Sequence, residues 1–208
     1  MTCSPTFDEE TKLHKQGYHF VAGVDEVGRG ALAGPVVAAA VILPIGANFF
    51  WLSQVRDSKE VSPLKRQTIS KLAQQSEIAI GLGSIPNSII DERGIVKATQ
   101  LAMTQAIKKL PLTPDFILID AIALPGIPLP QKSIVHGDRL CLSIACASII
   151  AKVNRDEYMQ QQDILYPGYG LAGHKGYGTR EHMLNLNELG PCPIHRRSFS
   201  PVRRSIQR

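Results

Sequence analysis

The chain has 208 residues, of which 44% are hydrophobic and 20% are charged, so the composition excludes wholesale disorder. This length suits one domain with a proper core, with room for a short appendage. The net charge of +5 equals the charge of residues 191–208, which hold five arginines and no acid, so residues 1–190 are balanced and a uniformly cationic surface is excluded. We expect this basic tail either to contact phosphates or to be a solvated end.

Cysteine spacing and hydropathy bear on the compartment. The four cysteines show neither CxxC spacing nor the density of a disulfide scaffold, and Cys141 and Cys146 fall in an apolar helical segment where buried thiols are expected. Residues 1–17 are polar, which predicts no signal peptide. Prolines and glycines divide the uncharged stretch 30–55, which predicts a buried strand plus a loop rather than a membrane span. We therefore expect a cytoplasmic protein.

The first half of the chain alternates apolar runs with helical patterns, after a polar stretch that frays or forms a short leading helix. Pro63 directly after Ser62 is typical of a helix start, and the Gly-rich turn after the first strand predicts an antiparallel second strand. In chain order we expect strand, strand, helix, strand and two helices, at residues 20–27, 36–43, 64–75, 78–85, 86–92 and 94–110.

The second half opens with an apolar strand at residues 116–119 that ends at Asp120, followed by a Pro-rich loop at 124–130 that leads to residues 133–135. A long helix comes next, and Thr179 is the expected N-cap of a last helix. The long helix is expected at residues 140–161 and the last helix at residues 180–189. Mixed strands followed by alternating helices predict an α/β domain with a partly antiparallel sheet.

Two adjacent acids, Asp25 and Glu26, interrupt the first apolar strand. Neighbouring side chains on a strand point to opposite faces, so alternation alone cannot solvate both acids. Burial of an unpaired carboxylate is costly or shifts its pKa, so the pair requires a cation or hydrogen-bond donors. The following Gly28-Arg29-Gly30 supplies backbone freedom and a guanidinium, and together these residues predict a site where metal ions meet a phosphate.

Asp120 and Asp138 stand where other buried elements end or begin. If they converge with Asp25 and Glu26, the four carboxylates form a hard-oxygen site that prefers Mg²⁺ or Mn²⁺ to zinc. Two such ions roughly 3.5–4 Å apart can activate a water and stabilise the leaving oxygen in phosphodiester cleavage. A structural alternative stays open for each acid taken alone: Asp120 ends a strand before a turn, and Asp138 caps a helix.

The chain carries Val-Asp-Glu-Val-Gly-Arg-Gly at residues 24–30, continued by a small apolar run at 32–40. Together with further motifs along the chain, this stretch resembles the signature of the bacterial ribonuclease HII family. Any one tripeptide is weak, but the ordered set is specific. The further matches, in the family's order, lie at residues 57–59, 118–120, 137–138, 143–153, 155–156, 174–179 and 195–199.

The resemblance implies an RNase H-like fold, a central mixed sheet flanked by helices with a small helical C-terminal appendage. It divides the chain into a catalytic domain, 1–165, and an appendage, 166–208, that contributes to substrate binding. The implied activity is cleavage of RNA within RNA–DNA hybrids and of single ribonucleotides embedded in duplex DNA. Cleavage would fall on the 5′ side of the ribonucleotide and leave 3′-hydroxyl and 5′-phosphate ends. The implied cofactors are two divalent ions, Mn²⁺ or Mg²⁺, and we expect a monomer.

The resemblance also implies roles for single residues. The metal ligands and catalytic acids would be Asp25, Glu26, Asp120 and Asp138, while the Gly28, Arg29 and Gly30 backbone and the Tyr177 ring would recognise the 2′-hydroxyl. The chemistry fits independently, since a protein tells RNA from DNA by the 2′-hydroxyl, glycines permit close backbone approach, and a tyrosine can stack and donate. The alternatives are a plain turn for the glycines and a half-buried surface aromatic for Tyr177.

Other polar residues are candidate phosphate contacts, with helix-surface solvation as the competing interpretation: Lys59, Ser148, Lys152, Lys175 and Arg180. Ser148 and Lys152 are four apart and so share a helix face. For His174 and His195 we expect loop hydrogen bonding rather than metal ligation.

The chain departs from the family pattern after Asp138. Arg139, Leu140 and Cys141 replace an Ala-Lys-Ser-like stretch, and His136 stands where a lysine is common. These changes rearrange the charge near the fourth acid and leave substrate affinity and metal preference open. They also suggest that Cys141 makes the activity sensitive to oxidation.

Two other functions compete with a ribonuclease. One is a non-catalytic hybrid-binding protein that kept the fold, which four carboxylates argue against because phosphate binding favours cations. The other is a different nuclease on the same fold, such as a DNA resolvase, and a requirement for a 2′-hydroxyl distinguishes the two.

Overall fold

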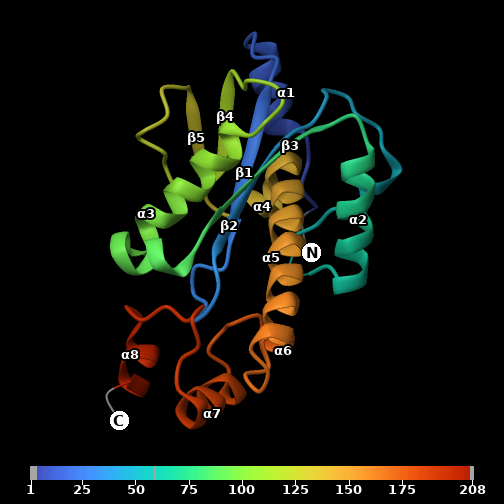
Figure 1. The fold of residues 1–208 in the computed structure, drawn as a ribbon. Helices are drawn as coiled ribbons and strands as arrows, with labels where there is room; N and C mark the ends of the chain where they lie inside the picture. Colours follow the sequence, from blue (N-terminus) through green and yellow to red (C-terminus); the bar gives the residue numbers. More distant parts are fainter. Residues whose placement is uncertain (1–3, 59, 207–208) are drawn as a thin grey trace.

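The computed structural model describes residues 4–58 and 60–206, and its centre is a five-stranded sheet in the order β3-β2-β1-β4-β5 (Figure 1). The first three strands pair antiparallel, whereas β4 and β5 run parallel to β1 and to each other. The predicted mixed sheet is therefore confirmed. The strands are β1 Val21–Val27, β2 Val36–Ile42, β3 Ala79–Ile85, β4 Phe116–Asp120 and β5 Gln131–Ile134.

Strand β2, between β3 and β1, is buried along its whole length because helices cover both faces of the sheet. Its alternate side chains enter two separate cores, since successive residues of a strand point to opposite faces. Val37, Ala39 and Val41 pack with residues of α2 (Pro63–Gln75) and α5 (Leu142–Leu165). The intervening Val36, Ala38 and Ala40 pack with α3 (Asn87–Lys108) on the other face.

Two helices begin where the sequence predicts a helix start, and each has a side-chain cap. Ser62 Oγ accepts a hydrogen bond from the Lys65 N–H at 3.4 Å, and Thr179 Oγ1 accepts one from the His182 N–H at 3.2 Å. The two helices expected at 86–92 and 94–110 are the two arms of α3, which bends at Gly94, where φ is +76°.

Helix α5 begins at Leu142, not at residue 140 as expected. Cys141 is extended and forms a β-bridge with Thr6, and the residues before it make a separate turn, α4 (Gly137–Leu140). The cap of α5 comes from α1 (Asp8–Lys15): Glu10 Oε1 accepts hydrogen bonds from Ser143 N and Oγ at 2.9 and 2.6 Å. A cap that lies 133 positions away in the chain has no local sequence signal.

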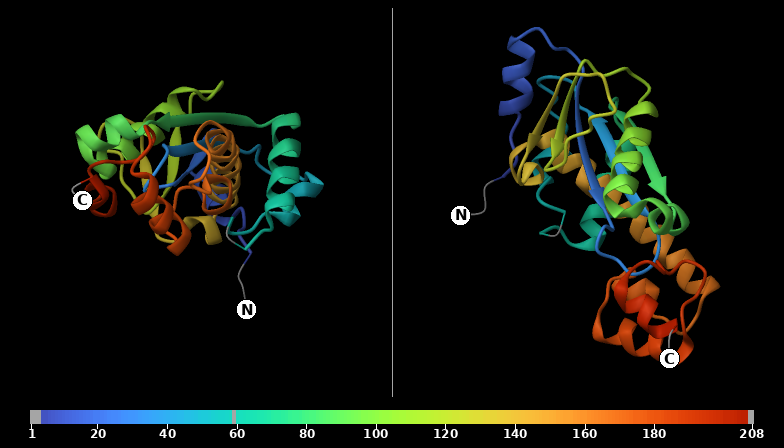
Figure 2. Two further views of the ribbon diagram at one scale, coloured as in Figure 1. Left: turned by 60° about the horizontal axis from the view of Figure 1, so that its bottom comes forward. Right: turned by 90° about the vertical axis from the view of Figure 1, so that its left-hand side faces the viewer.

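The C-terminal helices gather at one end of the sheet, beyond the end of α5 (Figures 1 and 2). They pack in small clusters of their own, which include Ala33 and Leu32 from the turn between β1 and β2. The helices are α6 Leu171–His174, α7 Arg180–Leu189 and α8 Ser200–Ile206. Four short elements were not expected from the sequence: the 3-10 helix η1 (Phe50–Gln54), β5, α6 and α8.

Two expectations about compartment and thiols can be compared with the fold. Within residues 4–58 and 60–206, no helix is long and apolar enough to cross a membrane. Cys141 and Cys146 are buried free thiols, as expected, and so is Cys192, while Cys3 lies outside the described residues.

The contact between β1 and α5 depends on a glycine. A Cβ at Gly23 would lie 2.3 Å from the Ser143 carbonyl carbon and 2.4 Å from the Ile144 nitrogen, so helix and strand would have to separate. We expect Gly23→Ala to lower the free energy of unfolding by about 3 kcal/mol or more, at the upper end of overpacking effects. Chemical denaturation measures this, with Gly126→Ala as the control because a Cβ there meets nothing within 4 Å. Equal stability of the two variants would contradict this packing.

Candidate active site

A cleft of about 400 Å³ lies at the end of β1, beside α5 and the loop before α7. The four predicted acids line it together: Asp25, Glu26, Asp120 and Asp138. So do the other predicted site residues within the described part of the chain: Gly28, Arg29, Gly30, Ser148, Lys152 and Tyr177. Lys59 lies outside the described residues, and Arg180 is exposed at the start of α7.

The sheet brings the acids together. β1 and β4 are parallel neighbours, and Val24 lies opposite Ile119. Asp25 and Asp120 are the next residues of the two strands, so they lie side by side at the same end of the sheet. Asp120 Oδ1 then accepts a hydrogen bond from the Gly137 N–H at 2.8 Å, which ties the start of α4, and with it Asp138, to the end of β4.

The backbone beside these acids is strained. Ala121 and His136 have φ values of +55° and +58°, in the left-handed region that residues other than glycine rarely adopt. Such strain persists only where the surrounding structure enforces it, and it is concentrated at functional sites. His136, one of the departures from the family pattern, thus shapes the turn between β5 and α4.

Asp25 is the most deeply buried of the four acids, with 5% of its surface exposed. Burial raises its pKa well above the usual range, and the charges of Glu26 and Asp120 raise it further, whereas a hydrogen bond with Ser148 opposes the rise. Its Oδ1 accepts from the Glu26 N–H at 2.7 Å. The ionised form of Asp25 is therefore poorly compensated by the protein itself.

The negative charge of Glu26 is also incompletely compensated by the protein. Its Oε1 lies 3.3 Å from Arg29 Nη1, while its Oε2 is buried without a hydrogen-bond partner in the described part of the chain. Burial raises the pKa of Glu26, and Arg29 counteracts this. A buried, unpartnered carboxylate oxygen in an acidic cleft suits an oxygen-preferring cation.

The acids surround the cleft rather than forming a closed cage. Among the described residues, no three or more His, Cys, Asp or Glu side chains lie close enough together to coordinate an ion without moving. Like charges repel, and bringing these carboxylates closer requires positive charge between them. The donor set fits a divalent cation, and side-chain adjustment would accompany its binding.

Two buried arginines hold the turn that follows the acids, and sequence reasoning assigned them no role. Arg196 donates to the carbonyls of Gly28, Arg29 and Gly34 at 2.7, 2.9 and 3.0 Å. Because a trans peptide directs its C=O and N–H to opposite sides, the N–H groups of Arg29 and Gly30 point away from Arg196. The clamp therefore fixes the direction of the backbone donors in this turn.

Arg155 completes the clamp from α5. It donates to Pro35 O at 3.0 Å, Ala33 O at 3.1 Å and Lys175 O at 2.9 Å, so it joins the turn to the loop that carries Tyr177. Its guanidinium also lies 5.4 Å from the centre of the Tyr177 ring, within cation–π range.

The two glycines of the turn have different reasons to be glycine. Gly28 has a φ of +92°, and a Cβ there would lie 2.2 Å from Arg155 Nε, so it permits the arginine to pack. At Gly30 a Cβ would meet nothing within 4 Å, and the space in front of it is open. Packing of Arg155 thus explains the glycine at position 28, and the open space at Gly30 is compatible with close approach of a ligand; approach of a sugar to both glycines stays a prediction.

A chain of histidines fixes the backbone of Tyr177. His195 Nδ1 accepts from the Cys192 N–H at 3.0 Å, so the neutral ring carries its proton on Nε2 and donates to His182 Nε2 at 3.0 Å. His182 then carries its proton on Nδ1 and donates to the Tyr177 carbonyl at 3.0 Å. Both histidines are held neutral by this arrangement.

The other histidine and the departures from the family pattern can also be placed. His174 donates to Tyr169 O at 2.8 Å, so the expected loop hydrogen bonding of His174 and His195 is confirmed. Arg139 Nε lies 3.0 Å from Asp57 Oδ2 and is thus paired away from the cleft. Cys141 is buried, and burial raises the pKa of its thiol to about 12, which disfavours the reactive thiolate; the expected sensitivity to oxidation stays a prediction.

The histidine chain predicts a pH dependence of stability. Burial lowers the pKa of His195 to about 4 and also lowers that of His182. Between pH 6.5 and 4 the unfolded chain binds more protons at these sites, so stability falls as the pH falls; for His195 the loss is about 3 kcal/mol. We expect His195→Gln to lose less stability than the parent over this interval, measured by urea unfolding at each pH. Parallel curves for the two proteins would refute the assignment.

Comparisons with known proteins agree with the geometry of the cleft. A family model described as Ribonuclease HII matches residues 22–202. A ribonuclease HII of Dehalococcoides mccartyi is 52% identical over 202 residues, which cover 97% of this chain and 95% of the relative. One of Geotalea uraniireducens is 50% identical over 95% of this chain and 90% of the relative.

Among solved structures, the ribonuclease H2 of Pyrococcus horikoshii OT3 superposes with a TM-score of 0.75 at 24% identity, over 90% of this chain and 97% of that one. At this identity the match shows the fold alone, and it confirms the expected RNase H-like architecture. From the family model and the close relatives, the chain belongs to the ribonuclease HII family of metal-dependent phosphodiester endonucleases.

Proposed function

We propose that this protein cleaves the RNA strand of RNA–DNA hybrids and cuts duplex DNA on the 5′ side of a single embedded ribonucleotide, leaving 3′-hydroxyl and 5′-phosphate ends. We further propose that it acts as a cytoplasmic monomer with two divalent ions, Mg²⁺ or Mn²⁺. The observation that carries the proposal is that the four acids line one cleft together with Gly30 and Tyr177. Metal-holding and sugar-sensing groups thus face the same space.

Asp25, Glu26, Asp120 and Asp138 would hold the ions. The buried, unpartnered Oε2 of Glu26 and the raised pKa of Asp25 support this, since both describe carboxylates that need positive charge. When bound, divalent ions supply the Lewis acidity that activates a water and stabilises the leaving oxygen. An RNase HIII of similar fold, 18% identical with a TM-score of 0.75 over 93% of this chain and 71% of that one, has been solved in complex with Mn²⁺.

The chain's own residues would position the substrate. The N–H groups of Arg29 and Gly30 point away from Arg196, and the open space at Gly30 lets a sugar come within hydrogen-bond distance of them. Tyr177, held through its carbonyl by His182 and through its ring by Arg155, can stack on the sugar or base and donate its hydroxyl. These groups together could distinguish a nucleotide with a 2′-hydroxyl.

The same contacts support the proposed division of the chain into a catalytic domain and an appendage. Residues 1–165 would supply the acids and the glycine turn, and residues 166–208 would supply Tyr177 and the Arg196 clamp. The appendage would therefore take part in substrate recognition and would also hold the turn in the catalytic domain.

The test uses a labelled DNA duplex that contains one ribonucleotide, with Mg²⁺ or Mn²⁺. We expect a single cut on the 5′ side of the ribonucleotide and no cut in the all-DNA duplex. Asp25→Asn should reduce the cleavage rate by a factor of about 10³ or more, because the transition state loses a metal ligand, while the Kd for the duplex changes by less than about tenfold.

Tyr177→Ala provides the matched control for recognition. It should reduce the preference for the ribonucleotide-containing duplex over all-DNA while leaving metal-induced stabilisation unchanged. Binding without any cleavage would favour the non-catalytic hybrid-binding protein, and cleavage of the all-DNA duplex would favour a different nuclease on this fold.

A further inference from the structure

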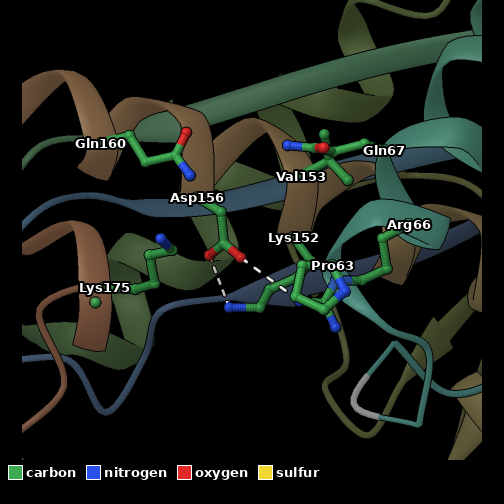
Figure 3. Close-up of a pocket in the computed structure, with 9 residues that line it drawn as sticks. Pro63, Arg66, Gln67, Lys152, Val153, Asp156, Gln160 and Lys175 are labelled. Carbon is green, nitrogen blue, oxygen red and sulfur yellow. Dashed lines mark hydrogen bonds and ion pairs between the residues drawn. The ribbon is translucent and has the colours of Figure 1, made fainter.

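A second cavity, of about 230 Å³, lies between α2, α5 and the end of α6 (Figure 3). Lys152 lines both this cavity and the acidic cleft, so the two spaces adjoin. Arg66, Lys152 and Lys175 bring three cations, whereas Asp156 is the one carboxylate among the described residues that line it. The lining therefore has a surplus of positive charge next to the site of cleavage.

The cations are held in place rather than loosely solvated. Asp156 Oδ1 accepts from Lys152 Nζ at 2.7 Å, and its Oδ2 lies 3.8 Å from Arg66 Nη2. Arg66 also donates to the carbonyls of Ser58 and Val61 at 2.7 and 2.6 Å, which fixes its guanidinium. Figure 3 shows Lys175 on the opposite side of the cavity from Arg66, with Asp156 and Lys152 between them.

Lys175 reaches the cavity from a constrained backbone. Its φ is +54°, and its carbonyl accepts from Arg155 Nη1 at 2.9 Å, so the clamp that positions Tyr177 also positions Lys175. Structural pairing explains why Asp156 gathers Arg66 and Lys152. The ammonium of Lys175 donates to the Ala172 carbonyl, which orients it without neutralising its charge, so the cavity keeps more positive charge than its one carboxylate can balance.

We propose that this cavity binds a backbone phosphate of the same nucleic-acid substrate, at a distance from the phosphate that is cut. The inference rests on the proposed function, because it takes the occupant of the acidic cleft to be a nucleic acid. Phosphate contacts of this kind fix the register of a protein on a duplex without reading its sequence. The subsite would thereby hold the substrate so that only one phosphate faces the acids.

The length of α5 gives the spacing. Ser148, Lys152 and Asp156 follow one another at intervals of four and so lie along one helix face. Ser148 faces the acids, and Asp156 lies eight residues further on, or about 12 Å along the helix axis. For a duplex that lies along α5, this corresponds to about three or four nucleotides at 3.4 Å each.

The experiment measures binding of the ribonucleotide-containing duplex in the Asp25→Asn background, so that no cleavage interferes. We expect Lys175→Gln to raise Kd by about three- to tenfold and to reduce the slope of log K against log salt by about 1. Lys175→Arg should restore both. Lys108→Gln, on α3 across the sheet, serves as the control and should change neither the binding nor the cleavage rate in the parent.

Neutral methylphosphonate linkages, placed one at a time along both strands, then locate the contact. One position, three or four nucleotides from the ribonucleotide, should weaken binding when Lys175 is present and have no effect in Lys175→Gln. Equal behaviour of Lys175→Gln and Lys108→Gln, or equal sensitivity to every linkage with and without Lys175, would overturn the subsite. If the parent cuts the duplex in that case, the proposed function stands; if it neither binds nor cuts, the proposed function itself fails.

Discussion

The buried carboxylates of Asp25 and Glu26 are the constraint on which the rest of the site depends. Their pKa values are raised by burial, and Asp120 adds a further negative charge, while Arg29 is the cation paired with Glu26. A protein that uses such positions only for packing would be more stable with neutral side chains there. The arrangement becomes favourable when external positive charge enters the cleft, and this links the electrostatics of β1 to metal-dependent chemistry.

The second requirement is a rigid turn next to these acids, and two buried arginines provide it. The donors of Arg155 and Arg196 end on carbonyl oxygens from the turn and from the Lys175 loop. Carbonyls satisfy the hydrogen bonds of a guanidinium without neutralising its charge. Burial and the neighbouring Arg155 together lower the pKa of Arg196 to about 9. Positive charge therefore remains behind the glycine turn, where it favours an approaching phosphate, and the same contacts hold the appendage to the catalytic part of the chain.

Local sequence signals predicted most of the elements, whereas the resemblance to ribonuclease HII predicted which residues line the cleft. Strand patterns, the caps at Ser62 and Thr179 and the break at Gly94 agree with the fold because each depends on nearby residues. The predicted start of α5 was wrong because the residue that caps this helix, Glu10, comes from a distant helix. The sequence did not reveal that Gly28 makes room for Arg155, or that the Cys141 side chain turns into the core. Long-range packing, which periodicity does not report, accounts for all three.

If the carboxylates of the cleft destabilise one another until divalent ions bind, thermal unfolding should report it most directly. In EDTA at pH 8, Asp25→Asn should melt a few degrees above the parent, since a shift of about 1 kcal/mol moves the Tm of a domain this size by about 2–4 °C. Mn²⁺ should raise the Tm of the parent substantially and that of Asp25→Asn much less. A variant that melts below the parent in EDTA, with the same Mn²⁺ shift as the parent, would contradict the account.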